Sequence, residues 1–344
     1  NKFLLVRVSR TEKQIVLVAR PSQLGTISMC GICGELRHDG QTGRHDIIER
    51  MLPKLARRGP DFEGQWQNGP LALGHRRLAI IDLSERANQP MVDQELGLML
   101  VFNGSIYNYR ELRADLIKEG YHFFSEGDSE VIIKAYHKWG ERCPEYLHGM
   151  FAFAIWDTRT ESLFLARDRM GIKPLYYTQQ ESFFRFASNP QALLAGGEVD
   201  THIDPVALHH QLTLHAVVPA PRTILTGVRK LIPGTSLTIK VDGSSAQRRY
   251  WFLNAERPAE PRSEQEWTDA IHTALRESVR KRLEVADVPV GVLLSGGLDS
   301  SLLVALLAEA GVKDLLTFSI GFEDQPEEKG SEFEYSDQVV DRYQ

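Results

Sequence analysis

The segment from residue 288 to residue 322 places a buried strand, a Gly-Gly turn, a helix and a second buried strand in direct succession. The stretch VPVGVLL indicates the first strand, LDSSLLVALLAEAG a helix that ends at Gly311, and DLLTFSIGF the second strand. A strand, a helix and a strand in this order typically form a right-handed crossover between parallel strands. The pattern therefore predicts a βαβ unit, the start of a doubly wound α/β domain.

One βαβ unit is too small to be a domain, because a two-stranded parallel sheet leaves its apolar faces uncovered. Only about 80 residues follow the Pro- and charge-rich stretch NAERPAEPRSE, which is typical of a linker. Ser263 with Glu266 three residues on forms a capping box and predicts that a helix starts there. We expect a hairpin and linker at 236–262, and an incomplete second domain at 263–344 that stops at Gln344.

Between Cys30 and residue 235, short β-type runs such as FAFAIWD and SLFLARD are separated by helical periods. The stretch EVIIKAYHKWG repeats apolar residues at helical spacing, and Gly140 marks its end. Strands with helices segregated between them favour a layered α+β domain over an all-parallel sheet. We expect this first domain to span residues 30–235.

Composition narrows the class of partner. The 344 residues carry a formal net charge of -6, which argues against a general nucleic-acid or membrane-surface binder. No apolar run approaches the roughly 20 residues of a membrane helix. Three cysteines with a lone CxxC supply neither a disulfide scaffold nor four zinc ligands. We therefore expect a cytoplasmic protein that binds small molecules; a homodimer is left open.

Residues 1–28 precede a Met-Cys-Gly at 29–31 that has the form of a protein start. Charges interrupt their apolar stretches FLLVRV and IVLVA, so the apolar core of a secretory signal is missing. We interpret them as upstream sequence, with a functional propeptide as the alternative. If Met29 is trimmed, Cys30 carries its own base, because a free α-amine has a pKa of about 7.7–8.0. A buried structural cysteine is the alternative reading of Cys30.

Five motifs follow Cys30 in order: RRGPDFEG from Arg57, LGHRRLAIID from Leu73, VFNGSIYNYRELR from Val101, EGDSEVIIKAY from Glu126 and RDRMGIKPLYY from Arg167. Singly, each has an ordinary explanation; Asn103-Gly104, for example, is a common hairpin turn. In this order they resemble the class II glutamine amidotransferases, the N-terminal-nucleophile glutaminases found in asparagine synthetases. The resemblance implies an αββα fold for the first domain.

The resemblance also implies roles at the first site. Cys30 attacks the glutamine side-chain amide, while Asn103 and Gly104 form the oxyanion hole. Arg77 holds the substrate α-carboxylate and Asp128 its ammonium group. The remaining glutamine-binding positions are Ile80, Ile81 and Ser105. Asparagine synthetases usually carry Glu where Ser105 stands, and a hydroxyl does not replace that charge, so amine recognition rests more on Asp128.

The stretch GVLLSGGLDSS presents backbone N–H groups at a helix start, an arrangement that binds phosphate. A tight turn with an ordinary N-cap is the alternative, and the Gly-Lys-Ser/Thr ending of a Walker A loop is absent. The stretch resembles the pyrophosphate loop of the ATP-pyrophosphatase synthetases, which have the adenine nucleotide alpha hydrolase-like fold. That resemblance implies ATP and Mg²⁺, no prosthetic group, a magnesium ligand at Asp299, and nucleotide contacts from Leu293, Ser295, Gly296, Gly297, Asp299, Ser300 and Ile320.

Together the resemblances imply a glutamine-dependent, ATP-consuming carbon–nitrogen ligase that converts an adenylated carboxylate into a carboxamide. The stretches DPVALHHQLTLHAVVPAPRTIL and GVRKLIPG, with Ser105, favour the N-acetylglutaminylglutamine amidotransferase branch; asparagine synthetase is the alternative. A synthetase with a vestigial glutaminase, as in β-lactam synthetases, is disfavoured because Cys30 and its partner residues are all present. An inert, truncated chain is the further alternative.

Overall fold

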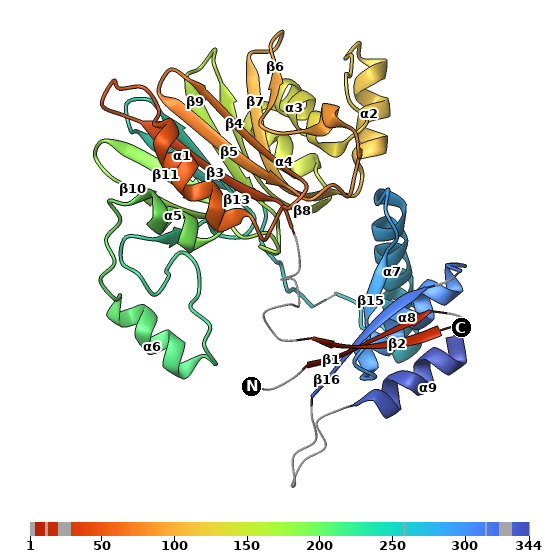
Figure 1. Cartoon of the computed structure of the whole chain (residues 1–344). Helices are drawn as coiled ribbons and strands as arrows, with labels where there is room; N and C mark the ends of the chain where they lie inside the picture. The colour runs from red at the N-terminus through yellow and green to blue at the C-terminus, as the bar shows by residue number, and fades with distance from the viewer. Residues whose placement is uncertain are drawn as a thin grey trace. The chain divides into compact units, whose positions relative to one another are not determined.

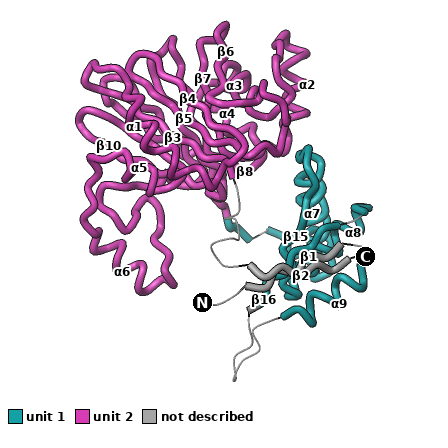
Figure 2. Tube along the Cα trace, in the orientation of Figure 1, with its two compact units in different colours: residues 1–26, 255–344 teal, residues 27–254 magenta. Residues whose placement is uncertain are grey.

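The computed structural model describes residues 4–10, 13–19, 29–257, 259–313, 315–322 and 332–343 (Figure 1). The chain divides into two compact units, one of residues 27–254 and one of residues 1–26 with 255–344 (Figure 2). Among the described helices, none has both the length and the apolar character needed to cross a bilayer.

The larger unit is built on two six-stranded sheets in which all neighbouring strands run antiparallel. The first has the order β12 (Arg229–Lys230), β10 (Tyr176–Gln179), β11 (Phe183–Ala187), β3 (Gly31–Arg37), β5 (Leu71–Arg77) and β4 (Phe62–Asn68). The second has the order β14 (Ser245–Arg249), β13 (Thr235–Lys240), β9 (Ser162–Arg167), β8 (Gly149–Asp157), β7 (Leu98–Ile106) and β6 (Met91–Asp93).

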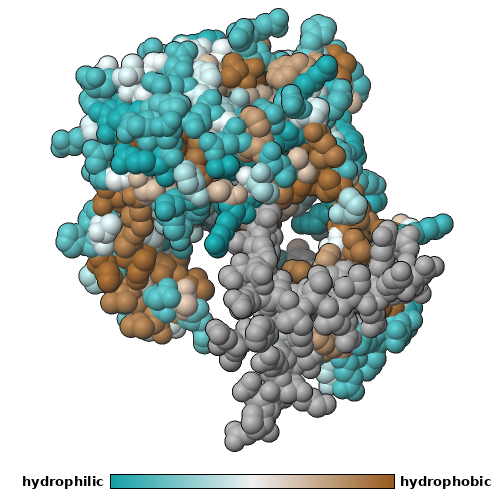
Figure 3. All heavy atoms as spheres, in the orientation of Figure 1, coloured by the Kyte–Doolittle hydropathy of each residue, from teal (hydrophilic) through white to brown (hydrophobic). Residues whose placement is uncertain are grey.

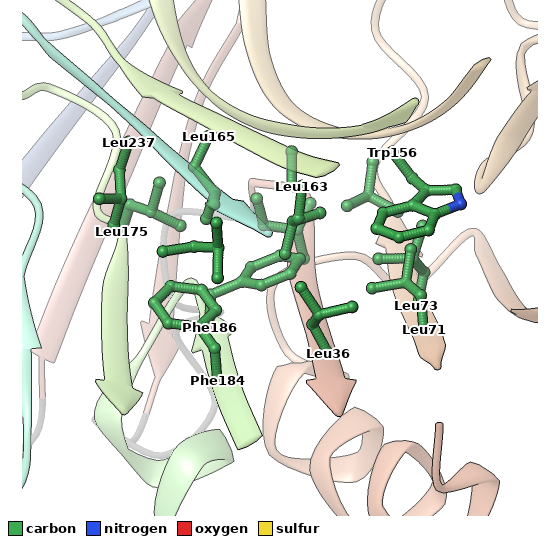
Figure 4. Packing of buried hydrophobic residues seen from close by; sticks show 14 of the residues in the cluster. Leu36, Leu71, Leu73, Trp156, Leu163, Leu165, Leu175, Phe184, Phe186 and Leu237 are labelled. Atoms are coloured by element: carbon green, nitrogen blue, oxygen red, sulfur yellow. The ribbon is translucent and has the colours of Figure 1, made fainter. Parts of the chain in front are cut away.

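The two sheets pack face to face through alternate residues of their strands, as the period of two along a strand requires. Leu71 and Leu73 of β5 and Phe184 and Phe186 of β11 meet residues of the second sheet that include Trp156 (Figure 4). These side chains are almost completely buried, and each contributes roughly 1.5–3 kcal/mol to folding. This shared core fixes the position of one sheet relative to the other.

Helices cover the outer face of each sheet. On the first sheet, Cys33, Ala72 and Ala187 point outward and pack against α1 (His45–Met51), the 3-10 helix η1 (Leu52–Leu55) and α5 (Pro190–Gly196). On the second, α3 (Asp128–Trp139) packs on β7 and β6 and brings Tyr136 to 5.2 Å from Phe164, measured between ring centroids. The neighbouring helix α2 (Tyr109–Lys118) contacts α3. The expected αββα layering is confirmed.

A buried ion cluster stabilises β3, the strand that begins next to Cys30. The Glu35 carboxylate accepts hydrogen bonds from Arg185 Nε at 2.5 Å and from Arg44 Nε at 2.9 Å. Glu35 and Arg185 are both fully buried. Because each charge has a partner, burying them is tolerated, and the cluster connects β3 to β11.

The larger unit extends beyond the boundary expected at residue 235. Strand β13 pairs with β9 along its whole length and forms a hairpin with β14, so this hairpin belongs to the second sheet. The unit ends at residue 254. The turn residues VDGSSAQRR mark a hairpin within the sheet, and the linker begins only after it.

A small helical segment of the larger unit presents apolar side chains on its surface. Helix α6 (Pro205–Thr213) and the residues around it carry exposed Ile203, Val206, Leu208, Leu212, Leu214 and Val217. Figure 3 shows apolar side chains gathered over this part of the molecule. Apart from Ile203, these residues lie within the stretch DPVALHHQLTLHAVVPAPRTIL, which therefore contributes a surface as well as core residues.

The smaller unit contains the predicted βαβ unit. Strands β15 (Gly291–Leu293) and β16 (Leu316–Phe322) pair in parallel and are connected by α8 (Leu298–Glu309). The long helix α7 (Glu264–Val285) starts at the predicted capping box, in which Ser263 and Glu266 bond reciprocally. Helix α9 (Phe333–Tyr343) packs on α8 and β16.

The segment before Met29 also enters this sheet. Strands β1 (Leu4–Arg10) and β2 (Lys13–Ala19) form an antiparallel hairpin, and β1 pairs antiparallel with β16. The strand order is β15-β16-β1-β2. Residues 4–8 of the stretch FLLVRV and the stretch IVLVA thus lie in strands. The sequence analysis did not predict their pairing.

Candidate active site

Cys30 lies immediately before β3, at an end of the first sheet. Its Sγ accepts a hydrogen bond from the Leu78 backbone N–H at 3.3 Å and donates to the Leu78 carbonyl at 3.6 Å. Leu78 directly follows β5, the neighbour of β3. The ladder between these two strands therefore determines the position of the thiol.

Asn103 reaches the same point from the second sheet. It lies on β7, is 1% exposed, and its amide, oriented to satisfy both neighbours, donates to the Cys30 carbonyl at 3.0 Å and accepts from Arg58 Nη2 at 3.3 Å. One residue before it, the Phe102 carbonyl lies 3.1 Å from Nε2 of His75 on β5. The two sheets are thus joined by polar contacts beside Cys30.

Gly104 follows Asn103 on β7, where a side chain would not fit. A Cβ atom at this position would lie 2.3 Å from the Met150 carbonyl oxygen on β8. The absence of a side chain lets β7 and β8 approach closely next to the thiol. Asn103 thus lies beside Cys30, with Gly104 next to it on β7. The assignment of these two residues to an oxyanion hole stays a prediction.

Arg77 is the last residue of β5 and is 6% exposed. Its Nη1 donates to the Ser84 carbonyl at 2.8 Å and to Asn88 Oδ1 at 2.7 Å, and its Nη2 donates to the Asp82 carbonyl. The guanidinium thus organises the loop that follows β5. In that loop Ile81 is buried and Ile80 is 38% exposed. Recognition of a substrate carboxylate by Arg77 stays a prediction.

Asp128, the first residue of α3, faces the same region. Its Oδ2 accepts a hydrogen bond from the Ile106 backbone N–H at 2.9 Å, next to buried Ser105. Asp82 Oδ2 in turn accepts from the Glu126 backbone N–H at 2.8 Å, which connects the Arg77 loop to the start of α3. All the predicted residues of the first site thus come from strand ends, one loop and the start of α3 within one unit.

The electrostatics around Cys30 are mixed. Burial is the largest influence and raises the pKa of the thiol, whereas its backbone hydrogen bond with Leu78 lowers that pKa. The Asp128 carboxylate raises the thiol pKa further, while Lys173 and Arg77 lower it. A buried thiol of this kind needs a base to become nucleophilic.

Two residues near Cys30 were missed in the sequence analysis. Arg58 donates from Nε to the Cys30 carbonyl at 3.1 Å. Lys173, 4% exposed, donates from Nζ to Met29 Sδ at 2.9 Å. Both belong to motifs quoted above, RRGPDFEG and RDRMGIKPLYY, and their presence in those motifs was the only signal in the sequence.

The candidate nucleotide loop lies in the smaller unit, between β15 and α8. Ser300 Oγ accepts from the Ser295 backbone N–H at 3.2 Å, and Ser295 Oγ accepts from the Gly297 N–H at 3.3 Å. Gly296 has a φ of +84°, which favours glycine. This hydrogen-bonded turn leads into the N-terminus of α8.

Five of the seven residues predicted to contact the nucleotide belong to this loop and the first turn of α8: Ser295, Gly296, Gly297, Asp299 and Ser300. Leu293 and Ile320, on the paired strands β15 and β16, are 59% and 47% exposed. Apolar side chains so exposed at neighbouring strands suit the face of a nucleotide base. Asp299 is exposed in the first turn of α8. No cluster of three or more metal-ligating side chains occurs in the part of the chain that the structure describes. A single carboxylate still fits Mg²⁺, which phosphate oxygens and water largely coordinate.

Comparison with protein families assigns a family model to each of two parts of the chain. The model of a glutamine amidotransferase domain matches residues 29–251. The chain therefore belongs to the glutamine amidotransferase family. The asparagine synthase model matches residues 270–344, which lie in the smaller unit.

Two curated relatives come from Bacillus subtilis (strain 168). Asparagine synthetase [glutamine-hydrolyzing] 3 is 35% identical over 303 residues, and asparagine synthetase [glutamine-hydrolyzing] 1 is 38% identical over 302 residues. Each alignment covers 86% of this chain but only 48% and 46%, respectively, of the relative. The chain thus spans less than half of the length of these relatives.

A solved structure supports the fold of the larger unit. Glutamine phosphoribosylpyrophosphate amidotransferase from B. subtilis, in a complex with ADP and GMP, superposes with a TM-score of 0.50 at 21% sequence identity. The match covers 65% of this chain and 50% of the other. The likeness concerns the fold, which is the one that the motifs predicted.

Proposed function

We propose that this chain releases ammonia from glutamine at Cys30, and that the loop at 295–300 binds the ATP that activates a carboxylate acceptor. The protein is then an ATP-dependent carbon–nitrogen ligase with glutamine as nitrogen donor. The convergence of Cys30 and Asn103 from two different sheets carries this proposal.

In the glutaminase half, Cys30 Sγ forms a bond to the amide carbon of glutamine while its proton passes to the α-amine of Cys30. Asn103 and the Gly104 N–H stabilise the oxyanion, and one such donor is worth about 2.7–4 kcal/mol. The ammonium formed at Cys30 then protonates the departing nitrogen, which leaves as ammonia. Water hydrolyses the thioester to glutamate and restores the thiol. Arg77 and Asp128 orient the two ends of the amino acid.

In the synthetase half, N–H groups of the 295–300 turn and the positive end of the α8 dipole hold ATP phosphates. Leu293 and Ile320 would contact the base, and Asp299 would hold Mg²⁺, which offsets phosphate charge when bound. The acceptor carboxylate attacks the α-phosphorus and displaces pyrophosphate. Ammonia then attacks the acyl-adenylate, giving the carboxamide and AMP.

For the acceptor, we propose an N-acetylglutaminylglutamine dipeptide, with aspartate as the second candidate. Ser105 and the stretch from residue 204 to residue 225 support the dipeptide. The names of the two B. subtilis relatives support aspartate. ATP–pyrophosphate exchange by the full-length protein discriminates between them. Exchange stimulated by the acetylated dipeptide and not by aspartate is expected, and the reverse result would assign the protein to asparagine synthesis.

The division of labour between the two sites predicts the effect of Asp299→Ala. In full-length protein, ATP-dependent synthesis should fall about 10²–10³-fold, because a group that stabilises phosphate charge is lost. Glutamine hydrolysis without ATP should change little, since Asp299 lies in the other unit. Asp341→Ala, which removes an exposed carboxylate from α9, is the matched control. Equal loss of both activities in a folded Asp299 variant would contradict the two-site assignment.

A further inference from the structure

Lys173 is a buried cation beside the candidate nucleophile, and no role has been assigned to it above. Its side chain is 4% exposed, and its Nζ donates to Met29 Sδ, the residue directly before Cys30. Burying an ammonium group is costly, so a lysine in this position needs nearby negative charge or a function.

The loop that carries Lys173 is firmly organised. Asp168 is 1% exposed, and its carboxylate accepts hydrogen bonds from the backbone N–H groups of Ile172 and Lys173, both at 2.9 Å. Arg167 Nε donates to the Lys173 carbonyl at 2.8 Å. Gly171, at a φ of +66°, makes the turn between them. These hydrogen bonds therefore fix the backbone of Lys173, and with it the position of the ammonium group beside Met29.

Four charged groups surround this thiol and lysine. The Asp128 carboxylate on α3 raises the pKa of the Cys30 thiol, whereas Arg77 on β5 and Lys173 lower it. Arg58 interacts electrostatically with both Cys30 and Lys173. The carboxylate of Asp168, in the same loop as Lys173, favours the charged form of that lysine. Asp128 and burial both disfavour a thiolate, and Asp128 is the residue expected to bind the substrate ammonium group. A compensating cation near the sulfur has a clear electrostatic purpose.

We propose that Lys173 is a positioning residue that stabilises the thiolate of Cys30 as it attacks glutamine, offsetting the Asp128 carboxylate. This inference rests on the proposed glutaminase function. Arg77 is committed to carbonyl and amide oxygens of its loop, and Arg58 to the Cys30 carbonyl and Asn103. Lys173 has no such competing partner once Met29 is removed, because its Nζ bonds only Met29 within the described part of the chain. A cation next to a cysteine characteristically lowers the thiol pKa.

The test measures the pH dependence of Cys30 alkylation by iodoacetamide in full-length protein from which Met29 has been removed. Lys173→Met should move the midpoint of the alkylation profile up by about one pH unit, so that the rate near pH 7.5 falls about tenfold. Lys173→Arg should keep the midpoint of the wild-type protein. Among the cysteines of residues 1–344, only Cys30 should react, because Cys33 and Cys143 are fully buried. Cys30→Ala supplies the blank, which subtracts alkylation at any other cysteine.

Lys230→Met is the matched control. Lys230 is a half-buried lysine of the same unit, and its Nζ donates to the Val218 carbonyl at 2.6 Å. Its replacement should leave the alkylation profile unchanged. A Lys173→Met protein that unfolds cooperatively, yet alkylates with the wild-type midpoint, would overturn the inference. Because alkylation requires no glutamine turnover, this result is distinguishable from failure of the proposed function, in which Cys30 is reactive but no glutamate is released.

Discussion

Replacing Cys30 with alanine is expected to abolish glutamine hydrolysis and to leave ammonia-dependent carboxamide synthesis by the full-length protein intact. Loss of a nucleophile typically costs roughly 10⁶-fold in turnover. No neighbouring group can take its place, because Asn103 is an amide and Lys173 is a buried cation. Glutamate release, followed with glutamine alone, and carboxamide formation, followed with ammonium salts, measure the two activities separately.

Cys33→Ala is the matched control for this experiment. Cys33 lies three residues further on in β3 but points into the cluster between the first sheet and α1, where it is fully buried. Burial raises the pKa of its thiol beyond any useful range. We expect this variant to lose some stability and to keep its glutaminase activity. If Cys30→Ala hydrolysed glutamine at the normal rate, Cys30 would not be the nucleophile.

Local patterns in the sequence were sufficient for elements whose hydrogen bonds are themselves local. The capping box of Ser263 and Glu266 and the stop of α3 at Gly140 are formed as expected. The βαβ unit was also predicted, since its strands, turn and helix are consecutive in the chain. In such segments the physical cause of the structure lies within a few residues.

Contacts between distant segments could not be predicted in the same way. The hairpin β13–β14 has ordinary turn residues, and only its pairing with β9, about 70 residues earlier, makes it part of the second sheet. The pairing of β1 with β16 brings together strands about 310 residues apart in the sequence. Neither partner is marked by a local pattern.

The site illustrates the same division. Five site residues were selected because their motifs occur in the order typical of the class II glutamine amidotransferases: Cys30, Asn103, Gly104, Arg77 and Asp128. The fold brings them together within one unit. Arg58 and Lys173 lie in the same motifs, but their importance comes from contacts with Cys30 and Met29 and, for Lys173, from burial. Burial of a charge depends on the packing of other segments, so a single sequence does not reveal it.

The second large effect concerns the backbone nitrogen of Cys30. In a protein in which Met29 stays attached, that nitrogen belongs to a peptide bond and has no lone pair available for a proton. The base that accepts the thiol proton and returns it to ammonia is then missing. General base catalysis contributes about 10²–10⁴-fold, so we expect glutaminase turnover to fall by that factor relative to protein that begins at Cys30.

The structure adds a second reason for the same result. The Met29 sulfur lies 2.9 Å from Lys173 Nζ and accepts a hydrogen bond from it. Met29 therefore engages the ammonium group that we propose supports the thiolate. Comparing full-length protein cut to begin at Cys30 with protein that retains Met29 separates the two states. Ammonia-dependent synthesis should be equal in both, which controls for folding. N-terminal sequencing of active protein should read Cys-Gly-Ile-Cys-Gly. Full glutamine-dependent turnover with Met29 still attached would rule out the α-amine as the base, because no proton could pass through an acylated nitrogen.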